Sequence, residues 1–342
     1  MSNRATVWSV GSYVPRRKVT NKMLSQHLET SDEWIRARTG IRERRYAAAD
    51  ETAATLSTYA ARAALYAAGV GAEKLDWVLV CTDTPEMWSP PTACFVQDAL
   101  SASHASAIDL TGGCAGFLQT LQLAEGMAAA GARVLVVGTE LLSRFVDPAD
   151  RHTAVLFGDA SAAFLLGSSA ERQGLSLGRS LSQSDGSQAD ILTNPYGGVR
   201  HEITAEVAAA GAHHTLHMDG PKVFKHAVHR MSQAGEALLA ESGLTSADLD
   251  WIVPHQANQR IIDAVTHQLG LDPSRVFSHV DRFANTGSAS VALAVADMLH
   301  QQLIRPRQAL LLVAFGAGFS WAARMLTADA LAPVLFLDGD TV

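Results

Sequence analysis

The stretch "GVGAEKLDWVLV" at residues 69–80 returns as "GLTSADLDWIVP" at residues 243–254, without a gap and 174 residues later. Two further pairs lie at nearly the same distance. "TGGCAGF" at 111–117 aligns with "TGSASVA" at 286–292, and "VLVV" at 134–137 aligns with "ALLL" at 309–312, both 175 residues apart. Three matches in one register predict an internal duplication. We therefore expect two similar α/β halves about a pseudo-twofold axis, with the loops at Cys114 and Asn285 facing one central cleft.

The first half alternates strand-like and helix-like segments. Apolar runs predict strands at residues 5–15, 76–82, 107–110, 133–140 and 161–167, with helices over 53–68, from 92 and after 114. Apolar strands separated by helices are typical of a sheet that is covered on both faces. The polar stretch at 167–190 is expected to form either a linker or a pair of exposed strands.

Composition narrows the class of protein. The chain has 342 residues, of which 48% are hydrophobic and 18% charged, so it can bury a large core. A net charge of −7 disfavours duplex nucleic acid as a partner, because binding to it needs a basic surface. Three cysteines give no basis for a disulfide framework and fit a reducing cytoplasm. The N-terminus lacks the apolar core of a signal peptide, and no apolar run is long enough for a membrane span.

Cys114 follows two glycines at the predicted start of a helix. The free N–H groups and partial positive charge of a helix N-terminus favour thiolate, the nucleophilic form of cysteine. The small neighbouring residues would let a thioester approach closely. The alternative is a small buried cysteine without a chemical role, and we expect that role for Cys81 in a strand and Cys94 in a helix.

Two residues of the second half are candidates to act with Cys114. His255 comes directly after a predicted strand in "DWIVPHQANQRIIDAV" (250–265), where catalytic groups collect in α/β sheets. Asn285 stands in "RFANTGSAS" (282–290). Taken alone, His255 could be a surface or capping residue and Asn285 a turn residue. The duplication brings both loops toward Cys114 and favours a shared site.

Three neighbouring histidines, His213, His214 and His217, suggest a metal site at first sight. No carboxylate or cysteine completes a plausible ligand set beside them. We therefore expect no metal there.

Five motifs together resemble the 3-oxoacyl-acyl-carrier-protein synthase III family of thiolase-fold condensing enzymes. They are "TSDEWIRARTGIRERR" (30–45), "GGCAGF" (112–117), "HQANQRII" (255–262), "NTGSAS" (285–290) and "LLLVAFGAGFSWAARML" (310–326). The resemblance extends from about residue 5 to residue 327. It implies a thiolase-like fold of two duplicated βαβαβαββ halves, residues 1–172 and 173–342, packed as a five-layer α-β-α-β-α sandwich.

The resemblance also implies a chemistry. Cys114, His255 and Asn285 would form a triad in which the cysteine accepts an acyl group from acyl-CoA. Condensation with malonyl carrier protein would follow, with neutral His255 and Asn285 donating hydrogen bonds to the thioester oxygen. The N–H groups of Cys114 and Ala317 would form the oxyanion hole, with Ala317 standing where the family usually has glycine. The resemblance implies a homodimer and, apart from the CoA thioester substrate, no cofactor and no metal.

Residues 30–45 are expected to bind CoA. A capping box of Thr30 and Glu33 predicts a short helix that ends at Gly40. Trp34 and Arg38 would sandwich the adenine, and neighbouring arginines would meet the phosphates; these are Arg36, Arg42, Arg44 and Arg45. The alternative is a solvated charged face.

The resemblance adds Thr30 and Arg151 to this site. It also places His152 where the family usually has glycine, so His152 would crowd or contact the adenine.

A basic amphipathic helix is predicted in "MDGPKVFKHAVHRMSQAGEALL" (218–239). Acyl carrier proteins are acidic, so this helix is a candidate docking surface, although an ordinary amphipathic helix is the alternative. By resemblance, Lys225 and Arg260 would dock the carrier. Substrate binding would involve Phe224, Ala257 and Asn258.

Met87, Trp88 and Ser89 lie in a segment that, in this family, reaches the acyl pocket of the partner subunit. Their identity does not reveal which acyl group is the primer. The tail at 327–342 extends past the usual end of the family and has no predicted structure.

Functions other than condensation use similar residues. Some relatives in secondary metabolism transfer acyl groups without condensing, and Asn285 favours condensation without excluding transfer. A papain-type hydrolase also uses Cys, His and Asn, but the sequence lacks the protease motifs around Cys114 and that fold has no internal duplication. A vestigial scaffold would be expected to lack a member of the triad, and none is missing.

Overall fold

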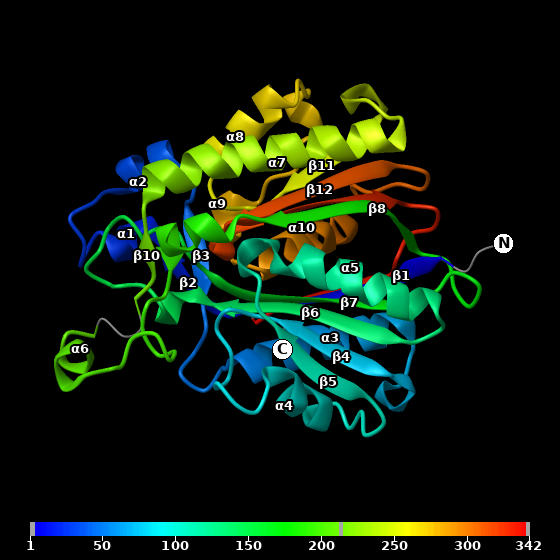
Figure 1. Ribbon diagram of the computed structural model, residues 1–342, viewed down its shortest axis with the longest axis horizontal. Helices are drawn as coiled ribbons and strands as arrows, with labels where there is room; N and C mark the ends of the chain where they lie inside the picture. The colour runs from blue at the N-terminus through cyan, green and yellow to red at the C-terminus, as the bar shows by residue number, and fades with distance from the viewer. Residues whose placement is uncertain (1–3, 212–214, 340–342) are drawn as a thin grey trace.

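The computed structural model describes residues 4–211 and 215–339, which fold into stacked layers of sheet and helix (Figure 1). The strands are β1 Ala5–Val14, β2 Arg17–Thr20, β3 Glu43–Tyr46, β4 Trp77–Cys81, β5 Ser106–Leu110, β6 Val134–Leu141, β7 Asp159–Ser168, β8 Leu175–Ser184, β9 Leu192–Thr193, β10 His217–Met218, β11 Trp251–Pro254, β12 Ala309–Gly316, β13 Ser320–Thr327 and β14 Val334–Asp338. The helices are α1 Asn21–Leu24, α2 Asp32–Thr39, α3 Ala53–Ala68, α4 Thr92–Ala99, α5 Gly116–Ala129, α6 Ala205–Ala209, α7 Gly220–Ser242, α8 Gln259–Gln268, α9 Val280–Phe283 and α10 Ala289–His300. Among these described residues, no helix is both long and apolar enough to cross a membrane.

A continuous path of hydrogen-bonded strands joins two halves of the chain. Its order is β11-β12-β13-β8-β1-β7-β6-β4-β5. The second half repeats the first in connectivity, with β8, β11, β12 and β13 in the places of β1, β4, β6 and β7. The halves meet where β1 and β8 pair at Thr6–Ser176 and Val7–Leu175. The strand order therefore repeats as the predicted duplication requires.

Helices α5 and α10 form the middle layer between the two halves of the sheet (Figure 1). All residues from Ala289 to Leu299 of α10 are buried, which explains why this helix is apolar on nearly every side, with Ser290 and Asp297 as its polar members. The sheet approaches α10 at Gly138, where a Cβ would lie 3.2 Å from the Cα of Ala289. Helices α3 and α4 cover the outer face of the first half, and α7 and α8 cover that of the second. The layers follow the predicted α-β-α-β-α order.

The polar stretch at 167–190 is neither a linker nor a pair of exposed strands. It forms a single long strand, β8, followed by a 3₁₀ helix over Gly186–Ile191. β8 pairs with β13 and β1, and the buried Leu175 and Leu177 face the core between the halves. The prediction was wrong because serines alternate with these leucines, so the sequence is polar on average although the strand lies in the centre of the sheet.

The C-terminal tail adds a strand that the sequence analysis left without a structure. β14 runs parallel to β1, with residues 10–14 opposite residues 334–338. It covers the part of the β1 edge that β8 does not reach. Arg45 clamps its end by donating two hydrogen bonds to the carboxylate of Asp338, at 2.9 and 3.0 Å. The tail therefore completes the sheet.

Replacing Phe336 by Ala should lower the free energy of unfolding by about 2 kcal/mol, because a half-buried ring would be lost. The ring centroid of Phe336 lies 6.1 Å from that of Phe283 and 5.4 Å from that of His300. Urea denaturation followed by circular dichroism would measure the change. Leu331→Ala in the same tail is the matched control, because Leu331 is 46% exposed and should change stability by less than about 0.5 kcal/mol. Equal losses in both variants would contradict the packing role of β14.

Candidate active site

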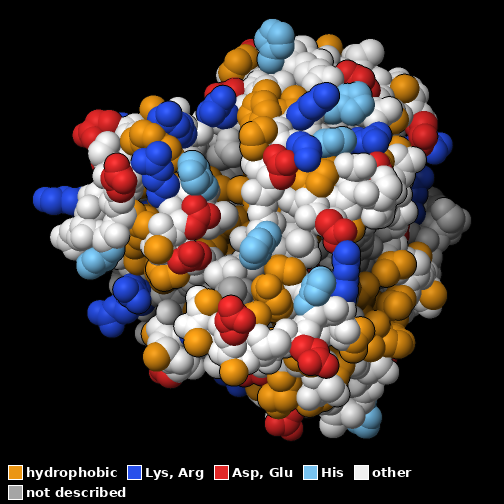
Figure 2. Space-filling view, turned by 60° about the vertical axis from the view of Figure 1, so that its left-hand side comes forward, with side chains coloured by type: hydrophobic (Ala, Val, Ile, Leu, Met, Phe, Trp, Pro, Cys, Tyr) orange, Lys and Arg blue, Asp and Glu red, His pale blue; other side chains and the backbone are white. Residues whose placement is uncertain are grey.

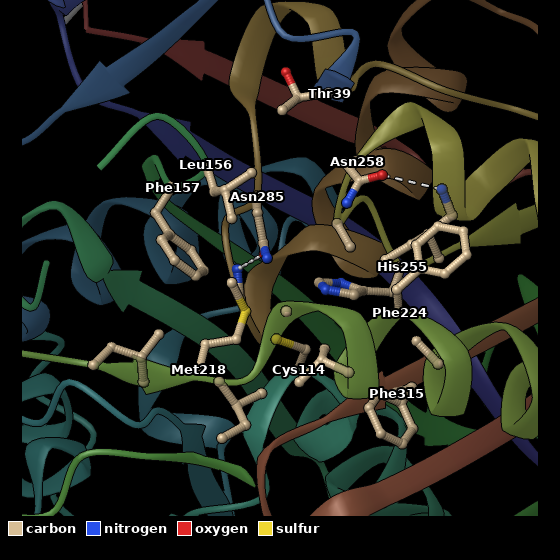
Figure 3. Close-up of a pocket in the computed structure, with 18 of the residues that line it drawn as sticks. Thr39, Cys114, Leu156, Phe157, Met218, Phe224, His255, Asn258, Asn285 and Phe315 are labelled. Atoms are coloured by element: carbon tan, nitrogen blue, oxygen red, sulfur yellow. Dashed lines mark hydrogen bonds between the residues drawn. The ribbon is translucent and has the colours of Figure 1, made fainter. Parts of the chain in front are cut away.

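A cavity of about 550 Å³ lies where the N-terminal ends of α5 and α10 meet the end of β11. Cys114, His255 and Asn285 line it, and Figure 3 shows their side chains converging. Cys114 belongs to a 3₁₀ turn, Gly113–Ala115, that leads into α5. His255 follows β11 directly, and Asn285 lies in the loop before α10. The structure therefore brings together three residues that are far apart in the sequence.

The loops that carry Cys114 and Ala317 pack directly against each other. Gly113 has a φ of +59°, and a Cβ there would lie 2.4 Å from the nitrogen of Ala317. A Cβ on Gly316 would lie 2.2 Å from the nitrogen of Cys114. Both positions therefore require glycine. The contact holds the backbone N–H groups of Cys114 and Ala317 in one small region beside the thiol.

The thiol of Cys114 does not have the acidity expected at the start of a helix. Burial raises its pKa well above the usual range, and the carboxylates of Asp83 and Glu140 raise it further. A hydrogen bond with the residue's own backbone N–H opposes these effects without cancelling them. The expectation that the helix N-terminus favours thiolate in the free protein was therefore wrong in its net result, because burial, together with two acidic side chains, outweighs the backbone N–H.

Asp83 and Glu140 are candidates that the sequence analysis missed. Both line the cavity, although Asp83 is partly exposed there while Glu140 is 1% exposed. Asp83 comes two residues after the end of β4, and Glu140 is the second-last residue of β6. Their places at the carboxyl ends of predicted strands were the available signal.

His255 is held as a neutral imidazole. It is 2% exposed, and burial lowers its pKa to about 3. Its Nδ1 lies 2.5 Å from the hydroxyl of Ser290, which belongs to α10. When that hydroxyl donates to Nδ1, the proton of the neutral ring is on Nε2, the nitrogen that is left for a ligand. Ser290 lies within the predicted "NTGSAS" motif, but its contact with His255 could not be deduced from spacing.

Asn285 is fixed by hydrogen bonds on both its backbone and its side chain. Its N–H donates to the carbonyl of Leu156 and its carbonyl accepts from Gly158, both at 2.9 Å. Its side-chain oxygen accepts from the N–H of Gly287 at 2.9 Å. The amide nitrogen is therefore the end that remains to donate to a ligand. The residue is not the N-cap of α10, which is Ser288, but its bond to Gly287 closes the turn that its sequence context predicts.

Comparison with known proteins gives a consistent result. The family model for 3-oxoacyl-[acyl-carrier-protein] synthase III matches residues 108–186, and the model for its C-terminal part matches 239–328. The β-ketoacyl-[acyl-carrier-protein] synthase III of Chlamydia caviae is 40% identical over 329 residues, covering 94% of this chain and 96% of that protein. The corresponding protein of Symbiobacterium thermophilum is 42% identical over 322 residues, covering 94% and 97%.

The chain belongs to the β-ketoacyl-acyl-carrier-protein synthase III family. Its members are acyltransferases of the condensing type, and so is this chain. The solved synthase III of Pseudomonas aeruginosa superposes with a TM-score of 0.88 at 36% identity, covering 96% of this chain and 100% of that one. The priming β-ketosynthase of a polyketide biosynthetic pathway superposes with a TM-score of 0.88 at 36% identity, covering 97% and 98%. The predicted thiolase-like fold is thereby confirmed.

The mouth of the cavity in this family member carries an aromatic ring between two arginines. The guanidinium carbon of Arg38 lies 4.4 Å from the ring centroid of Trp34, and that of Arg151 lies 5.2 Å from it. Trp34, Arg38 and His152 line the cavity, and Arg151 also donates to the carbonyl of Glu29 at 3.0 Å. The predicted CoA residues therefore lie together, with His152 beside them.

The capping box predicted in the CoA segment was wrong. The N-cap of α2 is Ser31, which accepts from the N–H of Trp34, so Thr30 and Glu33 do not form a capping box. The hydroxyl of Thr30 is buried without a hydrogen-bond partner among the described residues. The helix does end at Gly40, which adopts the left-handed conformation.

Arg44 and Arg45 are also not available for phosphates. Arg44 is 0% exposed and donates to Asn21 and to the carbonyl of Val155. Arg45 is 7% exposed and binds Asp338. Their partners come from distant segments, Val155 for Arg44 and Asp338 for Arg45, and such tertiary contacts cannot be read from a run of charged residues.

The other predicted site residues divide into two groups. Phe224, Ala257, Asn258 and Arg260 line the cavity, and Arg260 lies 5.6 Å from the ring centroid of Phe224. Lys225 is exposed on α7 near the mouth, outside the lining. Met87, Trp88 and Ser89 are exposed and do not line the cavity of their own chain.

The suggested histidine cluster receives no support. His213 and His214 lie outside the described residues. Within residues 4–211 and 215–339, no group of three or more His, Cys, Asp and Glu side chains is placed to hold a metal ion.

Replacing Ser290 by Ala should slow decarboxylation of malonyl carrier protein about tenfold, because the hydroxyl sets the tautomer and orientation of His255. If Cys114 is the acyl acceptor, its loading should change little, because the expected donors for that step are the N–H groups of Cys114 and Ala317. Carbon dioxide release and intact mass would report the two steps separately. Ser290→Thr keeps the hydroxyl and should recover part of the lost rate. Equal loss in both steps would indicate a purely structural role for Ser290.

Proposed function

We propose that this chain transfers an acyl group from acyl-CoA to Cys114 and then condenses it with a malonyl group on acyl carrier protein. The observation that carries the proposal is the convergence of one thiol and two neutral hydrogen-bond donors in a single cavity. Family membership supports the same reaction, which initiates fatty acid or related acyl-chain synthesis. We also propose that the boundary between the two halves lies between β7 and β8, at residues 172 and 173. From the free cysteines we further propose that the protein works in a reducing cytoplasm.

In the first step, the sulfur of Cys114 attacks the carbonyl carbon of acyl-CoA. The N–H groups of Cys114 and Ala317 are placed to donate to the oxygen as it becomes negative. The C–S bond to CoA then breaks, and the proton lost by Cys114 ends on the CoA sulfur. The product is a thioester on Cys114 and free CoA.

In the second step, His255 and Asn285 donate to the thioester oxygen of the malonyl group. The C–C bond to the carboxylate breaks, carbon dioxide leaves, and its electron pair forms an enolate. The enolate carbon attacks the carbonyl carbon of the acylated Cys114, and the C–S bond breaks. The Cys114 sulfur leaves as thiolate and regains a proton from solvent or a neighbouring group.

CoA binding is proposed at the mouth. Trp34 with Arg38 and Arg151 offers an aromatic face and two cations for adenine and phosphate. Thr30, whose hydroxyl lacks a partner among the described residues, lies next to this helix. His152 is exposed at the same mouth and would contact the nucleotide.

The carrier protein is proposed to dock on the face above the mouth. Figure 2 shows Lys, Arg and His side chains gathered along the upper part of this face, where α7 and α8 lie. Lys225 and Arg260 are exposed there, and Phe224 lies in the cavity wall between them and the thiol. A basic surface of this kind favours an acidic partner.

Half-reactions separate the proposed roles. Asn285→Asp should leave acyl loading largely intact yet slow condensation by more than about 10²–10³, because a donor becomes a negative charge beside the enolate. Cys114→Ala should abolish loading while leaving slow malonyl decarboxylation. Intact mass after incubation with a panel of acyl-CoAs, together with carbon dioxide release, measures both steps.

Opposite outcomes would overturn these assignments. If Asn285→Asp lost acyl loading but still decarboxylated the malonyl group, the roles assigned to the residues in the two steps would have to be reversed. Loading on Cys81 or Cys94 would exclude Cys114 as the nucleophile. A wild-type protein that loads acyl groups but never consumes malonyl carrier protein would be an acyltransferase that does not condense.

We also propose a homodimer in which Met87, Trp88 and Ser89 complete the partner's acyl pocket. Trp88 is 79% exposed, Met87 is 46% exposed, and the edge strand β5 presents Ile108 at 41% exposure. Trp88→Arg should weaken the dimer and slow acyl loading, as measured by analytical ultracentrifugation and intact mass. Tyr66→Arg is the matched control, because Tyr66 is 80% exposed on α3 and should leave the dimer intact. A fully active wild-type monomer at micromolar concentration would refute the proposal.

A further inference from the structure

Two acidic residues of the cavity wall are in direct contact, through the backbone N–H of one and the carboxylate of the other. Asp83 and Glu140 both line it, and the backbone N–H of Asp83 lies 3.2 and 3.3 Å from the two carboxylate oxygens of Glu140. They come from adjacent parallel strands, since β4 pairs with β6. The proposed reaction uses neither of them.

Each carboxylate holds one of the loops that form the site. Asp83 accepts from the N–H of Gly113, beside Cys114, at 3.3 Å. Glu140 accepts from the hydroxyl of Ser288 at 2.8 Å and from its N–H at 3.4 Å, in the loop that carries Asn285. The pair therefore faces the N-terminal ends of both α5 and α10. Its negative charge opposes the positive ends of the helices that would otherwise favour a thiolate.

The surroundings of the pair make two negative charges costly. In the described part of the chain, its hydrogen bonds come from backbone N–H groups and from the hydroxyls of Thr84 and Ser288. The other titratable groups facing it are Cys81, Cys114 and His255, and His255 is neutral. Burial and the charge of Asp83 raise the pKa of Glu140 to about 8, and burial raises that of Asp83.

We propose that Asp83 and Glu140 share one proton at neutral pH and act as positioning residues that keep Cys114 a neutral thiol until substrate is bound. The inference rests on the proposed role of Cys114 as the nucleophile. One negative charge remains on the pair and disfavours a second one on the nearby sulfur. The same charge anchors the loops of Cys114 and Asn285 against each other.

If the pair shares one proton, the effects of the single and double substitutions on the pKa of Cys114 should not be additive. In Asp83→Asn or Glu140→Gln, the remaining carboxylate loses its repelling neighbour, so its pKa falls. We expect this carboxylate to ionise and to keep one negative charge facing the thiol at pH 7. The single variants should therefore keep a thiol pKa close to that of the wild type. The double variant has no charge there, and its thiol pKa should fall by about one unit, which is a tenfold increase in thiolate.

Iodoacetamide alkylation of Cys114 as a function of pH, read by peptide mass spectrometry, tests this pattern. At pH 7 the double variant should react about threefold to tenfold faster than the wild type, because a more acidic thiolate is also a weaker nucleophile. Asn and Gln keep an oxygen that can accept from Gly113 and Ser288, so both loops should remain anchored. If the role of the pair were purely structural, the pH at which alkylation of Cys114 is half-maximal would not change.

Asp159→Asn is the matched control. Asp159 is another buried carboxylate, with its pKa raised to about 6, but it is not among the charges that act on Cys114. This variant should leave the alkylation profile unchanged, and circular dichroism would show that all variants fold.

Three results would overturn the proposal. Equal alkylation profiles in wild type and double variant would show that the pair does not control the thiol. If each single variant shifted the pH midpoint of alkylation, and the two shifts added up to the shift of the double variant, no proton would be shared. A shift as large in Asp159→Asn would show a non-specific effect. Because alkylation requires neither acyl-CoA nor carrier protein, failure here is distinguishable from failure of acyl loading.

Discussion

The site depends on the burial of two helix N-termini between two halves of a sheet. α5 and α10 lie in the middle layer, and the turns that lead into them line one cavity. The free N–H groups of a helix start must be satisfied when they are buried, because an unpaired buried polar group is costly. Asp83 and Glu140 supply acceptors from the strand ends, and their charges add to burial in raising the pKa of Cys114.

Duplication explains how one geometry carries two kinds of chemistry. At the offset of 175 residues that relates the two loops, Cys114 corresponds to Ala289 and Gly113 to Ser288. The first half therefore retains a thiol at its buried turn, while the second half presents the amide of Asn285 just before the equivalent turn. Because the two halves have equivalent connectivity, the loops of Cys114 and Asn285 both end in one cavity. The nucleophile and the hydrogen-bond donors therefore lie together without a long loop.

Local sequence patterns and the internal repeat were sufficient to predict much of this structure. The helix over Ala53–Ala68 begins and ends where its periodicity predicts, and the repeat brought Cys114, His255 and Asn285 together. The failures involve contacts between distant segments. β14 pairs with β1 across almost the whole chain, and the burial of Arg44 depends on Val155. The Asp83–Glu140 contact likewise depends on which strands are neighbours, and neither residue is unusual in its own sequence context.

The electrostatics of the cavity follow from the burial of its titratable side chains. Burial moves Cys114, His255 and Glu140 toward their neutral forms, raising the pKa of the acids and lowering that of the base. Hydrogen-bond donors that are already oriented and uncharged cost nothing to reorganise when a negative oxygen develops beside them. A charged imidazole would bind the ground-state carboxylate of a malonyl group as well as the enolate. A neutral one favours the enolate over the ground state, and this difference in binding accelerates the reaction.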